Sequence, residues 1–186
     1  MIDGLDGSGK STQAYLLLET LKKQHKTTCI RVHPESDNWF GQEARVFLLS
    51  SGKNAHFASA MFYMMDVIRS VLFYSWRRVD YIIFVRYFMG NAYLPKPLHT
   101  IGYNFFTKVL PKSKHMYFLD VTPEEAATRI KENRTETEMF ESYAALKKVR
   151  AKALSLTRFN SWTVIDGNKP AQEVASKIET SVLNAV

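Results

Sequence analysis

Eight residues near the start of the chain, GLDGSGKS at positions 4–11, match the phosphate-binding pattern G-x-x-x-x-G-K-[ST] at every fixed position. Glycines let such a loop curl so that its N–H groups point at phosphate oxygens, and the positive end of the following helix faces the same place. A lysine at position 10 reaches the β- and γ-phosphates, and the hydroxyl at position 11 ligates Mg²⁺. The sequence therefore predicts a site for ATP and Mg²⁺, with Ser11 as the metal ligand. The expected ATP-binding residues are Gly4, Leu5, Asp6, Gly7, Ser8, Gly9, Lys10, Ser11 and Thr12.

A phosphate-binding loop is shared by several enzyme classes, so the rest of the chain must narrow the reaction. The base-reading motif Asn-Lys-x-Asp of switch GTPases is absent, and 186 residues are fewer than large ATPase motors usually need. No Ser-His-Asp or Cys-His arrangement for covalent catalysis is found either. Phosphoryl transfer depends on positioning and positive charge, so these features favour a small kinase.

The elements that position this loop can be read from alternating apolar and helical patterns. Strands are expected at 1–3, 27–32, 81–85, 116–121 and 162–166, and helices at 11–24, 41–50, 56–78, 98–110, 123–133, 137–156 and 170–183. The alternation predicts an α/β fold, namely a P-loop NTPase fold with a five-stranded parallel sheet and helices on both faces. The length favours a single kinase domain over residues 1–186.

Two local signals refine this prediction. Thr122 precedes Pro123 and two glutamates, which is typical of a capped helix start with an acidic first turn. At the other end of the chain, only Met1, Ile2 and Asp3 precede the glycine loop, whereas the first strand of a P-loop fold is central and normally several residues long. We therefore expect a stub strand here, and a natural version that begins upstream.

Composition indicates a soluble protein with an anionic partner. The chain is 46% hydrophobic and carries a formal charge of +7, which suits nucleotides or nucleic acid. The basic residues are scattered and no nucleic-acid-binding motif occurs, so nucleotides are the expected partners. Cys29 is the single cysteine, which fits a cytoplasmic location. The apolar stretch 57–76 is long enough to cross a bilayer, but Asp66 and Arg69 within it indicate a buried core helix.

Motifs along the whole chain resemble the thymidylate kinase family. Residues 3–13 (DGLDGSGKSTQ) look like its phosphate-binding loop, and Arg-Tyr at 86–87 with Ala-Tyr at 92–93 looks like its Asp-Arg-Tyr … Ala-Tyr-Gln signature. The segments 117–126, 140–141 and 164–168 are similar to the strand and helix before its lid, the exit of the lid and its last nucleotide-facing loop. The resemblance implies ATP-dependent conversion of dTMP to dTDP, with a lid at about residues 129–142.

The same resemblance implies which residues bind the acceptor. Asp6 contacts the acceptor sugar and Arg86 holds its phosphate, while Phe62 and Tyr63 lie in the base-stacking helix, where an aromatic ring either stacks on the base or belongs to the core. The expected acceptor-binding set is Asp6, His33, Phe62, Tyr63, Asp66, Arg69, Arg86 and Tyr93. The expected catalytic set is Lys10, Arg86, Arg129 and Arg134.

Several positions depart from the family pattern. Val85 replaces the Asp of Asp-Arg-Tyr and cannot accept a hydrogen bond from a metal-bound water. Leu94 replaces the usual Gln, and the base-contacting Arg falls near Asp66 or Val67. Some members carry an Arg inside the loop, at the position of Gly7. The phosphate-binding residues are therefore kept while polar contacts to the base are lost.

Asp66 and the lid cations each leave two interpretations open. A carboxylate midway along an apolar helix needs a partner, so Asp66 either faces the cleft or pairs with Arg69 or Arg86. Arg129 and Arg134 lie at helical spacing before a polar stretch, which favours lid cations over a solvated face.

Two other functions fit the same residues. A related kinase could phosphorylate a nucleoside or another monophosphate, and a non-catalytic nucleotide-binding module could keep the loop and lose the acceptor site. Val85 favours either of them over a typical family member. A homodimer is left open.

Overall fold

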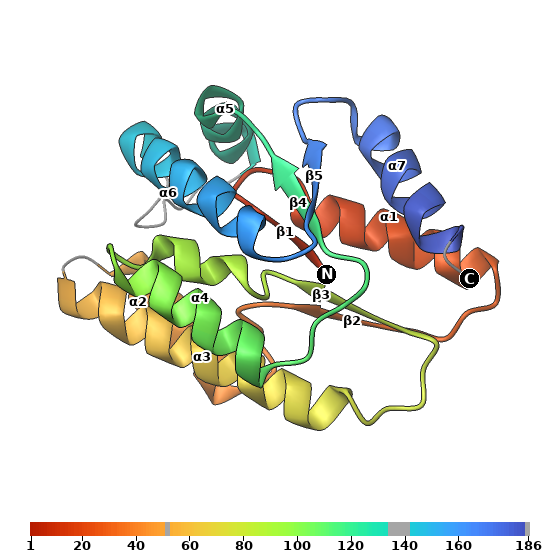
Figure 1. The fold of residues 1–186 in the computed structure, drawn as a ribbon, viewed down its shortest axis with the longest axis horizontal. Helices are drawn as coiled ribbons and strands as arrows, with labels where there is room; N and C mark the ends of the chain where they lie inside the picture. Colours follow the sequence, from red (N-terminus) through yellow and green to blue (C-terminus); the bar gives the residue numbers. More distant parts are fainter. Residues whose placement is uncertain (51–52, 134–141, 185–186) are drawn as a thin grey trace.

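Five parallel strands form the central sheet in the order β2-β3-β1-β4-β5 (Figure 1). The computed structural model describes residues 1–50, 53–133 and 142–184. The strands are β1 (Ile2–Gly4), β2 (Thr28–Val32), β3 (Tyr81–Val85), β4 (Tyr117–Asp120) and β5 (Thr163–Asp166). The ends of each strand lie within one residue of the predicted ends. The predicted fold class is confirmed.

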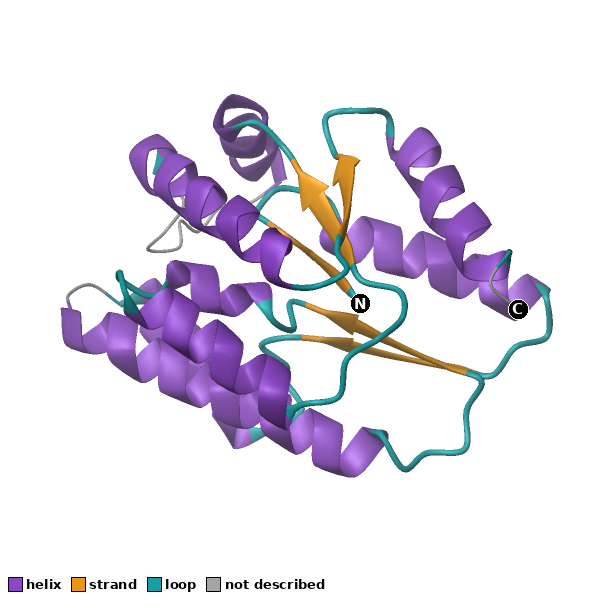
Figure 2. Cartoon of the chain, in the orientation of Figure 1, coloured by secondary structure: helices purple, strands orange, loops and turns teal. Residues whose placement is uncertain are grey.

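Helices cover both faces of this sheet (Figure 2). They are α1 (Lys10–Lys23), α2 (Trp39–Leu49), α3 (Lys53–Tyr74), α4 (Leu98–Val109), α5 (Pro123–Asn133), α6 (Tyr143–Leu156) and α7 (Ala171–Leu183), with 3₁₀ turns η1 (Met89–Tyr93) and η2 (Thr157–Phe159). Thr122 caps α5 as predicted, because its hydroxyl accepts a hydrogen bond of 3.3 Å from the Glu125 N–H. The helix expected from residue 137 begins at Tyr143 in the described residues, where Ser142 caps it.

Side chains alternate along the strands and divide the core in two. Phe84 and Phe118 point toward the cluster formed with α3, α4 and α6. Their neighbours Ile83 and Leu119 point the other way and pack with α1 and α7. Parallel strands covered on both faces need apolar side chains at every position, which explains the nearly continuous apolar run of β3.

The first strand is the stub that the sequence predicts, with three residues. It is nevertheless central, since Ile2 pairs with Val85 on one side and with Tyr117 on the other. The chain leaves β1 for β2 beyond β3, and later returns to β4 on the opposite side. The loop after β1 therefore lies at the point where strand order reverses, which is where open α/β sheets bind ligands.

The apolar helix α3 is only partly a core helix. Its 18-residue window Phe57–Tyr74 is long and apolar enough to cross a membrane by length and composition, but 28% of the window is buried. Val67 and Val71 pack into the core, whereas Met61 and Leu72 are 40% and 61% exposed. The expectation of a buried core helix holds only in part. One stripe of α3 faces the sheet, Phe62 packs on Phe47 of α2, and other apolar side chains of the helix face outward.

Candidate active site

The phosphate-binding loop is packed against the backbone of two other elements. A Cβ at Gly7, where φ is 75°, would lie 2.6 Å from the Ala126 carbonyl oxygen in α5. A Cβ at Gly4 would lie 2.6 Å from the Leu119 carbonyl oxygen in β4. Real Cβ atoms do not approach backbone oxygens this closely, so glycine is required at both places. The arrangement brings the start of α5 directly onto the loop.

Lys10 and Ser11 lie at the first turn of α1, as a phosphate site requires. The Lys10 ammonium donates to the Leu5 carbonyl oxygen and lies 3.8 Å from an Asp6 carboxylate oxygen. Ser11 is exposed, so its hydroxyl is accessible from the loop side. The Ser8 hydroxyl is buried and finds no hydrogen-bond partner in the described part of the chain. The loop thus combines a buried cation, Lys10, with one exposed hydroxyl residue, Ser11.

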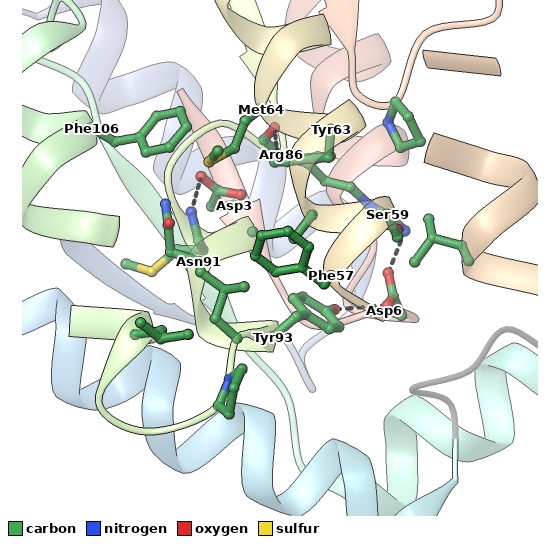
Figure 3. A pocket seen from close by; sticks show the side chains of 18 of the residues that line it. Asp3, Asp6, Phe57, Ser59, Tyr63, Met64, Arg86, Asn91, Tyr93 and Phe106 are labelled. Carbon is green, nitrogen blue, oxygen red and sulfur yellow. Dashed lines mark hydrogen bonds and ion pairs between the residues drawn. The ribbon is translucent and has the colours of Figure 1, made fainter. Parts of the chain in front are cut away.

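A cavity of about 480 Å³ opens beside this loop (Figure 3). That volume lies within the usual range for small-molecule sites. The polar lining residues are Asp3, Asp6, Ser59, Tyr63, Arg86, Asn91 and Tyr93. Asp6, Arg86 and Tyr93 meet at the loop end. The apolar lining residues are Pro34, Leu48, Phe57, Ala60, Met64, Met89, Leu94, Pro95, Leu98 and Phe106. The cavity therefore has one charged end and an apolar remainder.

Asp6 is the centre of the charged end. Its carboxylate accepts hydrogen bonds from the Arg86 guanidinium and, at 2.7 Å, from the Tyr93 hydroxyl. The Lys10 ammonium lies 3.8 Å from the same carboxylate oxygen that accepts the Arg86 hydrogen bond, so this one carboxylate links the phosphate-binding loop to the cavity. Figure 3 shows Asp6, Arg86 and Tyr93 turned toward one another at the cavity edge. Of the eight predicted acceptor residues, these three and Tyr63 line the cavity.

The structure places His33 and Asp66 away from the cavity, in the core behind it. The Asp66 carboxylate accepts hydrogen bonds from His33 Nδ1 (2.8 Å), the Glu35 N–H (2.9 Å) and Asn38 Nδ2 (2.7 Å). Burial pulls the pKa of Asp66 upward, but these hydrogen bonds outweigh it and the pKa is lowered. The two proposed partners, Arg69 and Arg86, were both wrong. Asp66 instead fixes the loop after β2, which explains a carboxylate in an apolar helix.

Phe62 and Arg69 also lie outside the cavity lining. Phe62 stacks on Phe47 of α2, with ring centroids 5.6 Å apart. Arg69 pairs with Asp37 at 3.5 Å. Both side chains point from α3 toward its partner segments rather than into the cavity, because the helical period turns them away when Tyr63 faces inward.

The lid cations are described only in part. Arg129 in α5 donates to Glu125 at 2.7 Å, one turn back along the helix. Arg134 and the stretch after it, residues 135–141, lie outside the described residues. On the far side, Arg150 of α6 holds Asp120 at the end of β4 through two hydrogen bonds of 2.7 and 2.8 Å. Of the lid expected at about 129–142, the structure describes only residues 129–133 and 142. On either side of it, α5 packs on the loop at Gly7 and α6 is held at Asp120 of β4.

Sequence reasoning missed Asp3, Ser59, Met64 and Asn91 in the cavity wall. Ser59 and Met64 lie in the helix that was singled out, but the face of α3 toward the cavity could not be read from a run that is apolar all round. Asp3 carried a usable signal, since an acidic residue in a buried central strand needs partners just as Asp66 does.

The family model described as thymidylate kinase matches residues 2–178. The chain belongs to the thymidylate kinase family. Among its relatives, a probable thymidylate kinase of Metallosphaera sedula is 26% identical over 185 residues, covering 95% of this chain and 87% of that protein. The thymidylate kinase of Thermosipho africanus is 24% identical, over 97% and 94% of the two chains.

The solved structure of thymidylate kinase from Candida albicans has the same fold, with a TM-score of 0.78 and 20% sequence identity over 99% of this chain and 90% of that one. At the position where the thymidylate kinase pattern has Asp, Val85 is fully buried, packs with α1 and does not line the cavity. The absence of an Arg at Gly7 also has a steric reason, since any side chain there meets the backbone of α5.

Proposed function

We propose that this member of the thymidylate kinase family transfers the γ-phosphoryl group of ATP to dTMP, over a single kinase domain of residues 1–186 with a lid at about 129–142. The observation that carries the proposal is the carboxylate of Asp6, shared by the ATP-loop lysine and by an arginine of the cavity. This contact supports a donor site at the loop and an acceptor site in the cavity that meet at one residue. The charged end of the cavity suits the acceptor phosphate and sugar, and its apolar remainder suits a pyrimidine.

Each residue contributes position or charge. The loop N–H groups and Lys10 hold the β- and γ-phosphates. Arg86 grips the acceptor phosphate, because a guanidinium can donate two parallel hydrogen bonds to it. An acceptor phosphate is already ionised, so a general base is unnecessary. Arg129 and Arg134 would add positive charge once the lid closes on both substrates, when that charge can act on the transition state.

Magnesium fits the residues at the loop. The Ser11 hydroxyl is accessible at the first turn of α1, and Mg²⁺ prefers one or two protein oxygens together with phosphates and water. No group of three or more His, Cys, Asp or Glu side chains suited to a metal occurs among the described residues, which agrees with an ion held mainly by the nucleotide. When bound, the ion supplies positive charge to the phosphates.

Base selection should be weaker than is usual for the family. The predicted base-contacting position falls at Val67, which is fully buried, and Leu94 lines the cavity with an apolar side chain. A methyl group in an apolar pocket changes kcat/KM by about ten- to two-hundredfold. We expect a dTMP to dUMP preference within that range. A preference of about three orders of magnitude would show that the base is read by polar groups after all.

A coupled assay of ADP release tests the proposal. It would compare dTMP with dUMP, other nucleoside monophosphates and free nucleosides at saturating ATP and Mg²⁺. Turnover of dTMP supports the proposal, and turnover of a different acceptor alone replaces it with a kinase of that class. ATP binding without turnover of any acceptor would indicate the non-catalytic module.

We further propose a cytoplasmic homodimer that buries the outer face of α3. Met61, Met65, Leu72 and Phe73 are 40–67% exposed there. Large exposed apolar patches on a protein surface often mark sites of protein–protein interaction. Sedimentation velocity of the wild type and of Leu72→Glu tests this, because a dimer through this face should become monomeric in the variant. A monomeric wild type would refute it.

A further inference from the structure

Asp3 is a buried carboxylate that holds the loop after β3. Asp3 belongs to β1, and only 1% of its surface is exposed to solvent. Its oxygens accept hydrogen bonds from the N–H groups of Tyr87 (3.1 and 3.2 Å), Phe88 (3.1 Å) and Met89 (3.3 Å). Three consecutive N–H groups directed at one carboxylate form an anion-binding turn. The conformation of this turn therefore depends on a residue outside it.

Arg86 begins this turn in an unusual backbone conformation. Its φ is 57°, in the left-handed region that a residue with a side chain adopts only when its surroundings hold it there. Its N–H donates to the Ile2 carbonyl oxygen at 3.2 Å. Its own carbonyl oxygen accepts a hydrogen bond from the Tyr63 hydroxyl. Both peptide groups of Arg86 are thus fastened to neighbouring elements.

Tyr63 is suited to this role. Burial raises the pKa of Tyr63 well above its usual value, so its hydroxyl stays protonated and remains a donor. Its ring also lies against the turn, because a Cβ on Gly90 would come within 2.4 Å of it. Tyr63 thereby supports residues 86–90 by a hydrogen bond and by close packing.

These constraints decide where the guanidinium of Arg86 points. With the backbone in the left-handed region, the side chain reaches Asp6 at the charged end of the cavity. A right-handed or extended backbone at this position would send the side chain in another direction, since φ sets the direction of the Cα–Cβ bond relative to β3. The backbone of Arg86 and of the turn after it is thus in contact with Asp3 and the Ile2 carbonyl of β1 and with Tyr63 of α3.

We propose that Asp3 and Tyr63 are positioning residues for Arg86, whose conformation they hold so that its guanidinium meets the acceptor phosphate. The inference rests on the proposed function, in which Arg86 grips that phosphate. Asp3 cannot itself bind the phosphate, because two anions repel each other, so it acts through the arginine. It follows that removing either holding group weakens acceptor binding and leaves ATP binding intact.

The test is a set of double-mutant cycles on the full chain. Asp3→Asn and Tyr63→Phe are made in the wild type and in Arg86→Ala, and KM for dTMP, KM for ATP, kcat and thermal unfolding are measured for each. Asp80→Asn is the matched control, because Asp80 also accepts a backbone N–H, from Thr27 at 2.8 Å, but at the amino end of β3. If these side chains only stabilise the fold, Asp3→Asn, Tyr63→Phe and Asp80→Asn should all lower the unfolding temperature without a selective change in KM for dTMP.

We expect Asp3→Asn and Tyr63→Phe each to raise KM for dTMP about tenfold, the scale of one lost hydrogen bond to a buried or charged group, with KM for ATP within about twofold. In the Arg86→Ala background the same changes should alter KM for dTMP by less than about twofold. Asp80→Asn should leave both KM values unchanged. If Asp3→Asn does not yield folded protein, Tyr63→Phe decides the question.

Two results overturn the inference alone: Arg86→Ala raises KM for dTMP while the holding variants leave it unchanged, or their effects persist in full without Arg86. A different pattern overturns the proposed function and the inference with it. In that case the wild type transfers no phosphate to any monophosphate, or Arg86→Ala is harmless.

Discussion

Replacing Arg86 with alanine removes a guanidinium that lies between the loop carboxylate and the acceptor cavity. Each hydrogen bond to a charged group contributes about 1.5–3 kcal/mol, so a two-pronged grip on phosphate is worth about 3–6 kcal/mol. Part of this is offset, because Arg86 already pairs with Asp6 in the free protein. A net loss of about 3 kcal/mol lowers kcat/KM for dTMP on the order of a hundredfold.

The assay is steady-state ADP release at varied dTMP, together with ATP binding measured by calorimetry. Arg86→Lys is the matched variant, since it keeps the charge and loses the planar fork, and it should recover only part of the activity. ATP affinity should change by less than about threefold in both variants, a difference of well under 1 kcal/mol. The reasoning is refuted if Arg86→Ala keeps kcat/KM for dTMP within about threefold of the wild type, or if the loss falls on ATP binding instead.

Three further predictions address other parts of the site. Lys10→Ala should abolish turnover while the protein still folds, as checked by circular dichroism, and phosphoryl transfer near the wild-type rate would refute the role of the loop. Arg129→Ala should lower kcat by about one to three orders of magnitude with ATP binding nearly unchanged, whereas full kcat in this variant would mean that the lid adds no charge to the reaction. The lowered pKa of Asp66 means that its contribution to stability is fully present above about pH 4 and is lost as the pH falls through the folded-state value. Asp66→Asn should therefore lower the free energy of unfolding by about 2 kcal/mol at pH 7. Urea melts should show the difference between variant and wild type shrinking toward pH 3. A difference that stays constant with pH would contradict a stabilising role for the ionised Asp66 carboxylate.

The nucleotide loop and the order of elements were readable from the sequence because they depend on local chemistry. Glycines at fixed spacing, a lysine and a hydroxyl admit one backbone arrangement, and the structure adds only that the tight approach to α5 demands Gly7. The strands were placed by short runs rich in apolar and β-branched residues, and the cap at Thr122 by a side chain that bonds its own neighbour. Interactions of this kind span a few residues, so pattern alone reveals them.

The acceptor site was only partly readable because its residues come together through long-range packing. Four residues of α3 were equally good candidates from the sequence: Phe62, Tyr63, Asp66 and Arg69. Apolar residues occur on all sides of this helix, so their spacing does not show which stripe faces the sheet. Tertiary packing turned Tyr63 into the cavity and buried Asp66 against His33, which stands 33 positions earlier.

The same holds for the link between β1 and the turn after β3. Sequence alone determined that Arg86 follows a buried strand at the ligand-binding edge of the sheet, and thus that it is a candidate to hold a phosphate. Only the tertiary structure decided where it points, because its conformation is set by hydrogen bonds to Asp3, 84 to 86 positions before the turn residues Tyr87 to Met89. Strand pairing creates that proximity, and no local pattern encodes it.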